Sequence, residues 1–210
     1  MSESVLLERT GALRRGRKLE YLTICWNLFE GVVAIVAGWL AGSISLMGFG
    51  IDSFVEVVSG AAVLWRITVD SEVERRELNE KKALKVVGGC FLVLSAYIAY
   101  ESVMDLWSKT GPEHSVPGII LACASLVVMP MLSRAKFKLG AALRSAAMNA
   151  DAKQARFCTY LSGILLGGLL LNAFWGLWWA DPLAAFLMVP IIVNEGIENL
   201  KGNHCQNCGA

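Results

Sequence analysis

Histidine is scarce in this chain, and its two copies, His114 and His204, lie outside the long apolar stretches. An enzyme site within those stretches would have to rely on carboxylates for acid–base chemistry, and no nucleophile–base constellation accompanies them. A glycine-rich phosphate loop following a strand is also missing, which disfavours ATP-driven pumping. The basic segment Met1–Lys18 has no small-residue cleavage site, and the apolar block after it is too long for a signal-peptide core. These absences disfavour an enzyme, an ATP-driven pump and a cleaved leader.

Charged residues make up only 18% of the chain, whereas hydrophobic residues make up 55% and the mean hydropathy is +0.53. A soluble domain is usually about one quarter charged. The apolar residues gather in about six blocks of spanning or near-spanning length, separated by charged or Gly/Pro-containing connectors. The sequence therefore predicts an all-α membrane protein whose surroundings are a lipid bilayer, and it gives no support to a nucleic-acid partner.

Six cysteines are present, but four of them lie within apolar blocks, where a thiol behaves mostly as a small hydrophobic group. A disulfide framework is therefore disfavoured. His204, Cys205 and Cys208 stand together in the tail, and a Cys-x-x-Cys pair supplies half of a tetrahedral metal site. The alternatives for this tail are a redox dithiol and a segment without a role.

The apolar blocks divide the chain into a basic N-terminal segment (1–18), a six-helix membrane domain (19–198) and a short tail (199–210). No further cytoplasmic domain is expected after the sixth span. Glu195 and Glu198 fall at the inner boundary of that span, where exposure to water costs little. The six spans are predicted at residues 19–41, 42–65, 85–107, 118–132, 146–175 and 182–193.

Lysine and arginine set the predicted orientation. Five lie in the N-terminal segment, six from Arg66 to Lys85 and four from Arg134 to Arg144, a stretch interpreted as a connector that includes Lys136. The connectors expected on the opposite side hold only Lys109. By the positive-inside rule, both termini are predicted to be cytoplasmic. The expected location is a bacterial inner (cell) membrane.

Two acids, Asp52 and Glu56, lie about halfway along the second predicted span. Each charge near the centre of a bilayer costs on the order of 3 kcal/mol on insertion scales. At four residues apart on a helix, the two carboxylates share one face, one turn apart. They would repel each other unless a cation, a proton or a basic side chain lies between them. A cation site is the favoured interpretation, and a structurally neutralised pair is the alternative.

Other polar residues are predicted at a similar depth. Glu30, in the first span, is expected near the middle of the bilayer, with Asn27 one turn before it. The fifth block offers Asp151, Gln154 and Cys158 on one helical face. Carboxylate, amide and thiolate groups can ligate zinc or a related divalent ion. The alternatives are helix–helix hydrogen bonds for the two amides, packing for the thiol, and a structural ion pair of Asp151 with Lys153 or Arg156.

The second span, the stretch Asn149-Ala150-Asp151-Ala152 with Gln154 and Cys158, and the turn Trp179-Ala180-Asp181-Pro182 resemble the cation diffusion facilitator (cation efflux) family. The short tail, the Asn-Leu-Phe-Glu-Gly segment around Glu30 and the Leu-Leu-Asn-Ala-Phe-Trp-Gly stretch are most similar to its transmembrane protein 163-like branch. The resemblance covers about residues 19–198.

The resemblance implies a six-span metal–proton antiporter, mostly for zinc, with an expected homodimeric state. It places the ion between the second and fifth spans, at Asp52 and Glu56 and at Gln154 and Cys158. The family usually has His and Asp at the last two positions, so this chain departs at both. No organic cofactor is expected. The alternatives are a metal-binding membrane sensor or regulatory subunit that does not transport, and a thiol-redox enzyme acting through Cys205 and Cys208.

Overall fold

The computed structural model describes residues 3–68, 73–109, 113–143 and 146–201, with side chains from residue 11 except at 66–84, 86, 87, 90, 146, 147, 150 and 199. Within these ranges the chain is entirely helical apart from short turns, which confirms the predicted all-α class. The tail cysteines and His204 lie outside the described residues. The helices are α1 (Glu3–Ala41), α2 (Ile44–Thr68), α3 (Val73–Ser108), α4 (Val116–Leu143), α5 (Ala146–Trp175) and α6 (Ala180–Lys201).

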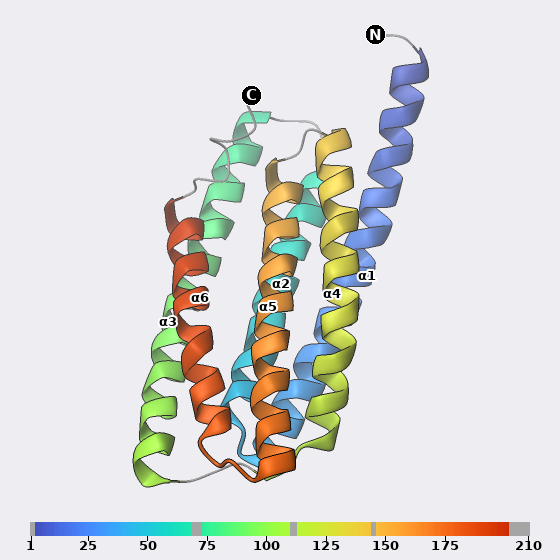
Figure 1. Cartoon of the computed structure of the whole chain (residues 1–210). Helices are drawn as coiled ribbons and strands as arrows, with labels where there is room; N and C mark the ends of the chain where they lie inside the picture. Colours follow the sequence, from blue (N-terminus) through green and yellow to red (C-terminus); the bar gives the residue numbers. More distant parts are fainter. Residues whose placement is uncertain (1–2, 69–72, 110–112, 144–145, 202–210) are drawn as a thin grey trace.

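The six helices form one bundle in which α2 is the most central (Figure 1). It contacts α1, α3, α5 and α6, while α3 packs along α6 and α4 packs along α5. The first turns of α1 and the last turns of α6 lie at the same end of the bundle (Figure 1). This placement fits an even number of crossings; that the shared end is cytoplasmic stays a prediction.

Five of the helices are long and apolar enough, by length and composition, to cross a membrane: Gly11–Ala41, Ile44–Trp65, Val116–Leu143, Asp151–Trp175 and Ala180–Glu198. The helix outside this set is α3, and some of its side chains lie outside the described residues. Large apolar side chains such as Trp39, Trp107 and Phe174 are exposed on the bundle surface. An outward apolar surface of this kind suits a bundle surrounded by lipid.

The fourth helix is much longer than the sequence predicts. Its predicted span ends at Leu132 and is followed by a charged connector, whereas α4 continues as helix to Leu143. Pro130 lies inside it, which is tolerated where neighbouring helices satisfy the freed backbone group. The buried positions recur at helical spacing from Gly118 to Gly140 and include Lys136, so the interior face of α4 extends well into the supposed connector.

Two helix pairs approach closely at glycines. A Cβ on Gly88 of α3 would come within 2.7 Å of the Gly196 carbonyl oxygen of α6. A Cβ on Gly50 of α2 would come within 3.0 Å of the Gly31 carbonyl oxygen of α1. Helices in lipid associate mainly through close packing of such small residues. These contacts hold α6 against α3, and α1 against α2.

Asp181, at the start of α6, fixes the turn between α1 and α2. Its carboxylate accepts hydrogen bonds from the Ser43 hydroxyl at 2.6 Å, from the Ser45 backbone N–H at 3.4 Å and from the Ser45 hydroxyl. Gly42 precedes these serines with a φ of 65°, a conformation that glycine adopts without strain. The carboxylate therefore binds the N-terminal end of α2, where a negative charge is also favoured by the helix dipole.

Replacing Asp181 by alanine is expected to lower the free energy of unfolding by about 2 kcal/mol, because three buried donors lose a charged acceptor. Thermal unfolding in detergent, followed by circular dichroism, measures the loss. Asp181→Asn retains one acceptor oxygen and is expected to lose less. Equal stability of Asp181→Ala and the unmodified chain would contradict this role.

Candidate functional site

The acidic pair of the second span is buried in the bundle, as the helical spacing indicated. Asp52 is 5% exposed and Glu56 is 1% exposed, on the interior side of α2. Neither oxygen of Glu56 has a hydrogen-bond partner in the described part of the chain. Because α2 is the most central helix, both carboxyl groups lie where side chains from several other helices can reach them.

Glu30 of α1 lies beside this pair. It is fully buried and accepts a hydrogen bond from the Ser53 hydroxyl of α2 at 3.1 Å. Asn27, one turn earlier, is also fully buried, and its amide nitrogen and oxygen have no hydrogen-bond partner among the described residues. The helix–helix hydrogen bond considered as an alternative role for Asn27 is therefore not observed in the described part of the chain. Glu30 therefore brings a further carboxyl group to the acidic side of α2.

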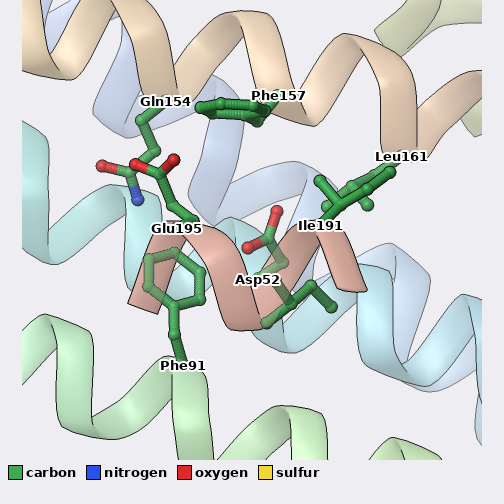
Figure 2. Close-up of a pocket in the computed structure, with 8 residues that line it drawn as sticks. Asp52, Phe91, Gln154, Phe157, Leu161, Ile191 and Glu195 are labelled. Atoms are coloured by element: carbon green, nitrogen blue, oxygen red, sulfur yellow. The ribbon is translucent and has the colours of Figure 1, made fainter. Parts of the chain in front are cut away.

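A small cavity lies against Asp52, between α2, α3, α5 and α6. The carboxyl groups of Asp52 and Glu195 and the amide of Gln154 come from three of these helices and converge on it (Figure 2). Gln154 is 6% exposed, and its amide nitrogen has no hydrogen-bond partner in the described structure. The remaining wall is apolar and consists of Phe91, Phe157, Leu161, Ile191 and Ile192.

The position of Glu195 differs from the prediction. The sequence places it at the inner boundary of the sixth span, where contact with water is cheap, but in the structure it is only 3% exposed. Glu198, one turn later, is partly exposed, as predicted. The difference arises because α6 packs along α3 and α5, which cover the side of α6 that carries Glu195.

Cys158 of α5 lies close to the acidic pair but is not one of the residues that line this cavity. Its side chain is 1% exposed, and it lies near enough to Glu56 for the carboxyl group to act on it electrostatically, although no hydrogen bond joins the two side chains. The structure therefore brings Cys158 to Glu56 and Gln154 to Asp52, so the polar residues of α2 and α5 face each other in two layers.

A buried basic residue, which sequence reasoning missed, lies next to the acidic pair. Lys136 of α4 is fully buried and forms ion pairs with Glu20 of α1 at 3.3 Å and with Asp151 of α5. Asp151 also accepts a hydrogen bond from the Ser59 hydroxyl of α2 at 3.1 Å. The Lys136 ammonium acts electrostatically on Glu56 as well. We call Glu20, Lys136 and Asp151 the buried triad.

The buried triad changes the interpretation of two residues. The interpretation of Lys136 as a connector charge that helps to set topology is wrong, because its side chain lies inside the bundle. Asp151 pairs with Lys136, whereas Lys153 and Arg156 are exposed and Arg156 lies over the Phe137 ring at 4.5 Å. Helical periodicity is the sequence signal that could have predicted the burial of Lys136. This residue follows Met129 and Ser133 at helical spacing on the buried face of α4.

No three His, Cys, Asp or Glu side chains among the described residues form a group that could hold a metal ion by themselves. A cation bound here would therefore need the Gln154 amide, a serine hydroxyl or water among its ligands, or a movement of the helices. Of the sequence-predicted ligands, Asp52, Glu56, Glu30, Gln154 and Cys158 are buried around one part of α2, while Asp151 is engaged in the buried triad.

Comparisons with known proteins agree with this architecture. Residues 83–203 match the cation efflux transmembrane domain family. Transmembrane protein 163 of Xenopus laevis is 29% identical over 87% of this chain and 65% of its own length. Magnetosome protein MamB of Paramagnetospirillum magneticum is 24% identical over 83% of this chain and 60% of its own length. The uncharacterized transporter YdbO of Bacillus subtilis is 27% identical over 93% of this chain and 69% of its own length.

The chain thus spans about two thirds of the length of these curated relatives, and its similarity to them extends over most of its own helices. The family match covers more than half of the chain and includes α4, α5 and α6 in full. With its all-helical bundle and apolar outer surface, the chain is a multi-pass membrane protein that belongs to the cation efflux transmembrane domain family.

Proposed function

We propose that this protein transports a divalent metal cation across the membrane through a site on the interior side of α2. The observation that carries the proposal is the burial of Asp52 and Glu56, one turn apart on the most central helix, with both Glu56 oxygens lacking a hydrogen-bond partner among the described residues. Buried acids in a membrane are costly and mark ion pathways by default. Membership of the cation efflux family supports the same function.

The proposed ligands are Asp52 and Glu56, with Gln154, Cys158 and Glu30 as co-ligands. Carboxylate, amide and thiol donors together suit zinc or a softer divalent ion better than magnesium. Zinc is therefore the first proposed cargo. Asp151 has its own cation in Lys136, which favours a structural role for it over direct ligation.

Export from the cytoplasm in exchange for protons is the proposed direction and coupling. Carboxylates and thiols bind metal in their deprotonated form, so a proton that reaches the site displaces the ion. The site lies inside the bundle, so alternating access would come from rocking of helices about it. A homodimer in a bacterial inner membrane is the proposed setting.

Metal flux into proteoliposomes tests the proposed function. The purified chain is reconstituted, a pH gradient is imposed, and uptake of zinc, cadmium, manganese and magnesium is followed with metal-sensitive dyes. We expect zinc flux that rises and falls with the gradient, above the background of protein-free liposomes. Calorimetric binding of zinc without flux of any ion would contradict transport and favour the metal-binding sensor or regulatory subunit.

A further inference from the structure

We infer that Asn27 of α1 is a ligand for the transported cation, at the same level of the bundle as Glu56 of α2. The inference rests on the proposed function and extends its site to a neutral amide on α1. Asn27 is fully buried, and neither its amide nitrogen nor its amide oxygen has a hydrogen-bond partner in the described part of the chain. Leaving both atoms unpaired inside the bundle costs free energy, and a bound ion would offset part of that cost.

Two contacts fix how α1 and α2 lie against each other. The helices are joined by a short turn and run antiparallel (Figure 1). Toward the turn, the Ser53 hydroxyl of α2 donates a hydrogen bond to the Glu30 carboxylate of α1 at 3.1 Å. Farther from the turn, a Cβ on Gly60 of α2 would come within 3.4 Å of the Glu20 carboxylate oxygen of α1. All four of these residues are buried.

Asn27 and Glu56 occupy matching positions between these two contacts. On α1, Asn27 lies three residues from one contact residue and seven from the other, which keeps it on the same helical face. On α2, Glu56 lies three residues from one contact residue and four from the other, again on the same face. Because the helices are antiparallel, the two positions lie at one level, each on the face of its helix that meets the other helix.

Glu56 is also without a direct partner. It is 1% exposed, and neither of its oxygens has a hydrogen-bond partner in the described structure, so no bond joins it to Asn27. The Lys136 ammonium acts on Glu56 electrostatically, but it forms its ion pairs with Glu20 and Asp151. A carboxylate and an amide at one level, with all four polar atoms unbonded, leave oxygen ligands open to a cation.

Cys158 of α5 supplies a donor of a different kind near Glu56. Its thiol is buried and close enough for the carboxyl group to act on it. A thiol ligates a metal as the thiolate, and its proton passes to water when the ion binds. Glu56 and Cys158 then supply two negative charges and Asn27 a neutral oxygen, a set that fits one zinc or cadmium ion completed by Asp52 or water.

Calorimetric titration of the purified full chain with Zn²⁺ tests the inference without relying on transport. Asn27→Leu keeps the branched outline of the side chain and removes both polar atoms, so we expect Zn²⁺ binding to weaken about tenfold. The amide has no partner to lose in the described structure, so this variant is expected to unfold without metal at the same or a higher temperature.

Thr23→Val is the matched control. Thr23 is a buried polar residue one turn from Asn27 on the same face of α1, but its hydroxyl donates a hydrogen bond to the Leu19 carbonyl oxygen at 2.9 Å. We therefore expect Thr23→Val to bind Zn²⁺ like the unmodified chain. Thermal unfolding of each variant, followed by circular dichroism, verifies that it is folded.

The outcomes separate this inference from the proposed function. Unchanged affinity in folded Asn27→Leu, with binding weakened in Glu56→Gln, would overturn the role of Asn27 and leave the site on α2 in place. Equal weakening in Asn27→Leu and Thr23→Val would also overturn it, because the effect would then come from the packing of α1. A sharp fall in the metal-free unfolding temperature of both Asn27→Leu and the smaller Asn27→Val would assign the amide a structural role instead. Absence of binding to the unmodified chain would overturn both the inference and the proposed function.

Discussion

Replacing Lys136 by methionine is expected to lower the free energy of unfolding by about 3–5 kcal/mol, the usual cost of removing one partner from a buried ion pair. Methionine keeps most of the side-chain volume, so the loss arises from charge. Glu20 and Asp151 would be left facing each other inside the bundle without the cation that separates them. Thermal or chemical unfolding in detergent, followed by circular dichroism, measures the effect.

A rescue variant makes this prediction sharper. Neutralising all three members, with Lys136→Met, Glu20→Gln and Asp151→Asn in one chain, is expected to recover most of the stability, since no uncompensated charge remains. Lys138→Met is the matched control, because Lys138 is exposed on the same helix two residues away. It is expected to change stability by less than about 0.5 kcal/mol. Normal stability of Lys136→Met alone would show that the triad is not what holds α1, α4 and α5 together.

Replacing Asp52 by asparagine and Glu56 by glutamine in one chain is expected to reduce metal flux at least about 100-fold, to the level of protein-free liposomes. Both substitutions preserve shape and remove charge, and each lost charged ligand is expected to weaken binding at least about tenfold. Each single variant is expected to retain residual flux, because one of the two carboxylates on α2 remains. Proteoliposome uptake of zinc under a pH gradient measures the difference.

The matched control is Glu101→Gln, which neutralises a membrane-region acid that is partly exposed on α3, outside the cavity. Its flux is expected to equal that of the unmodified chain. Folding of the double variant is checked by gel filtration and thermal unfolding, so that a loss of flux reports on the site. Flux that survives in a folded Asp52→Asn, Glu56→Gln chain would contradict the proposed site, whatever the metal.

Much of the architecture is predictable from the sequence because the bilayer leaves few options. Long apolar blocks must form helices, since backbone groups in lipid have to be hydrogen-bonded internally. A spacing of four residues must place Asp52 and Glu56 on one helical face, and their cost in lipid must turn that face inward. Both inferences hold in the structure, where α2 is central and both acids are buried.

Near the helix ends, the prediction that charged residues are exposed to water was wrong for two side chains. Lys136 and Glu195 lie near the boundaries of apolar blocks, where a sequence reading assigns charged residues to water. Helical periodicity carried better information, because the buried stripe of α4 passes through Lys136. The sequence could not show which helices extend beyond their apolar blocks and remain packed there.

The sequence by itself determined the helical class, the positions of most spans and the inward face of α2, because these depend on hydrophobicity and on the period of one helix. Only the tertiary structure decided which polar and charged side chains lie next to one another. Glu20, Lys136 and Asp151 come from three helices, as do Asp52, Gln154 and Glu195. These contacts depend on how the helices pack side by side, and the residue spacing along a single helix does not contain that information.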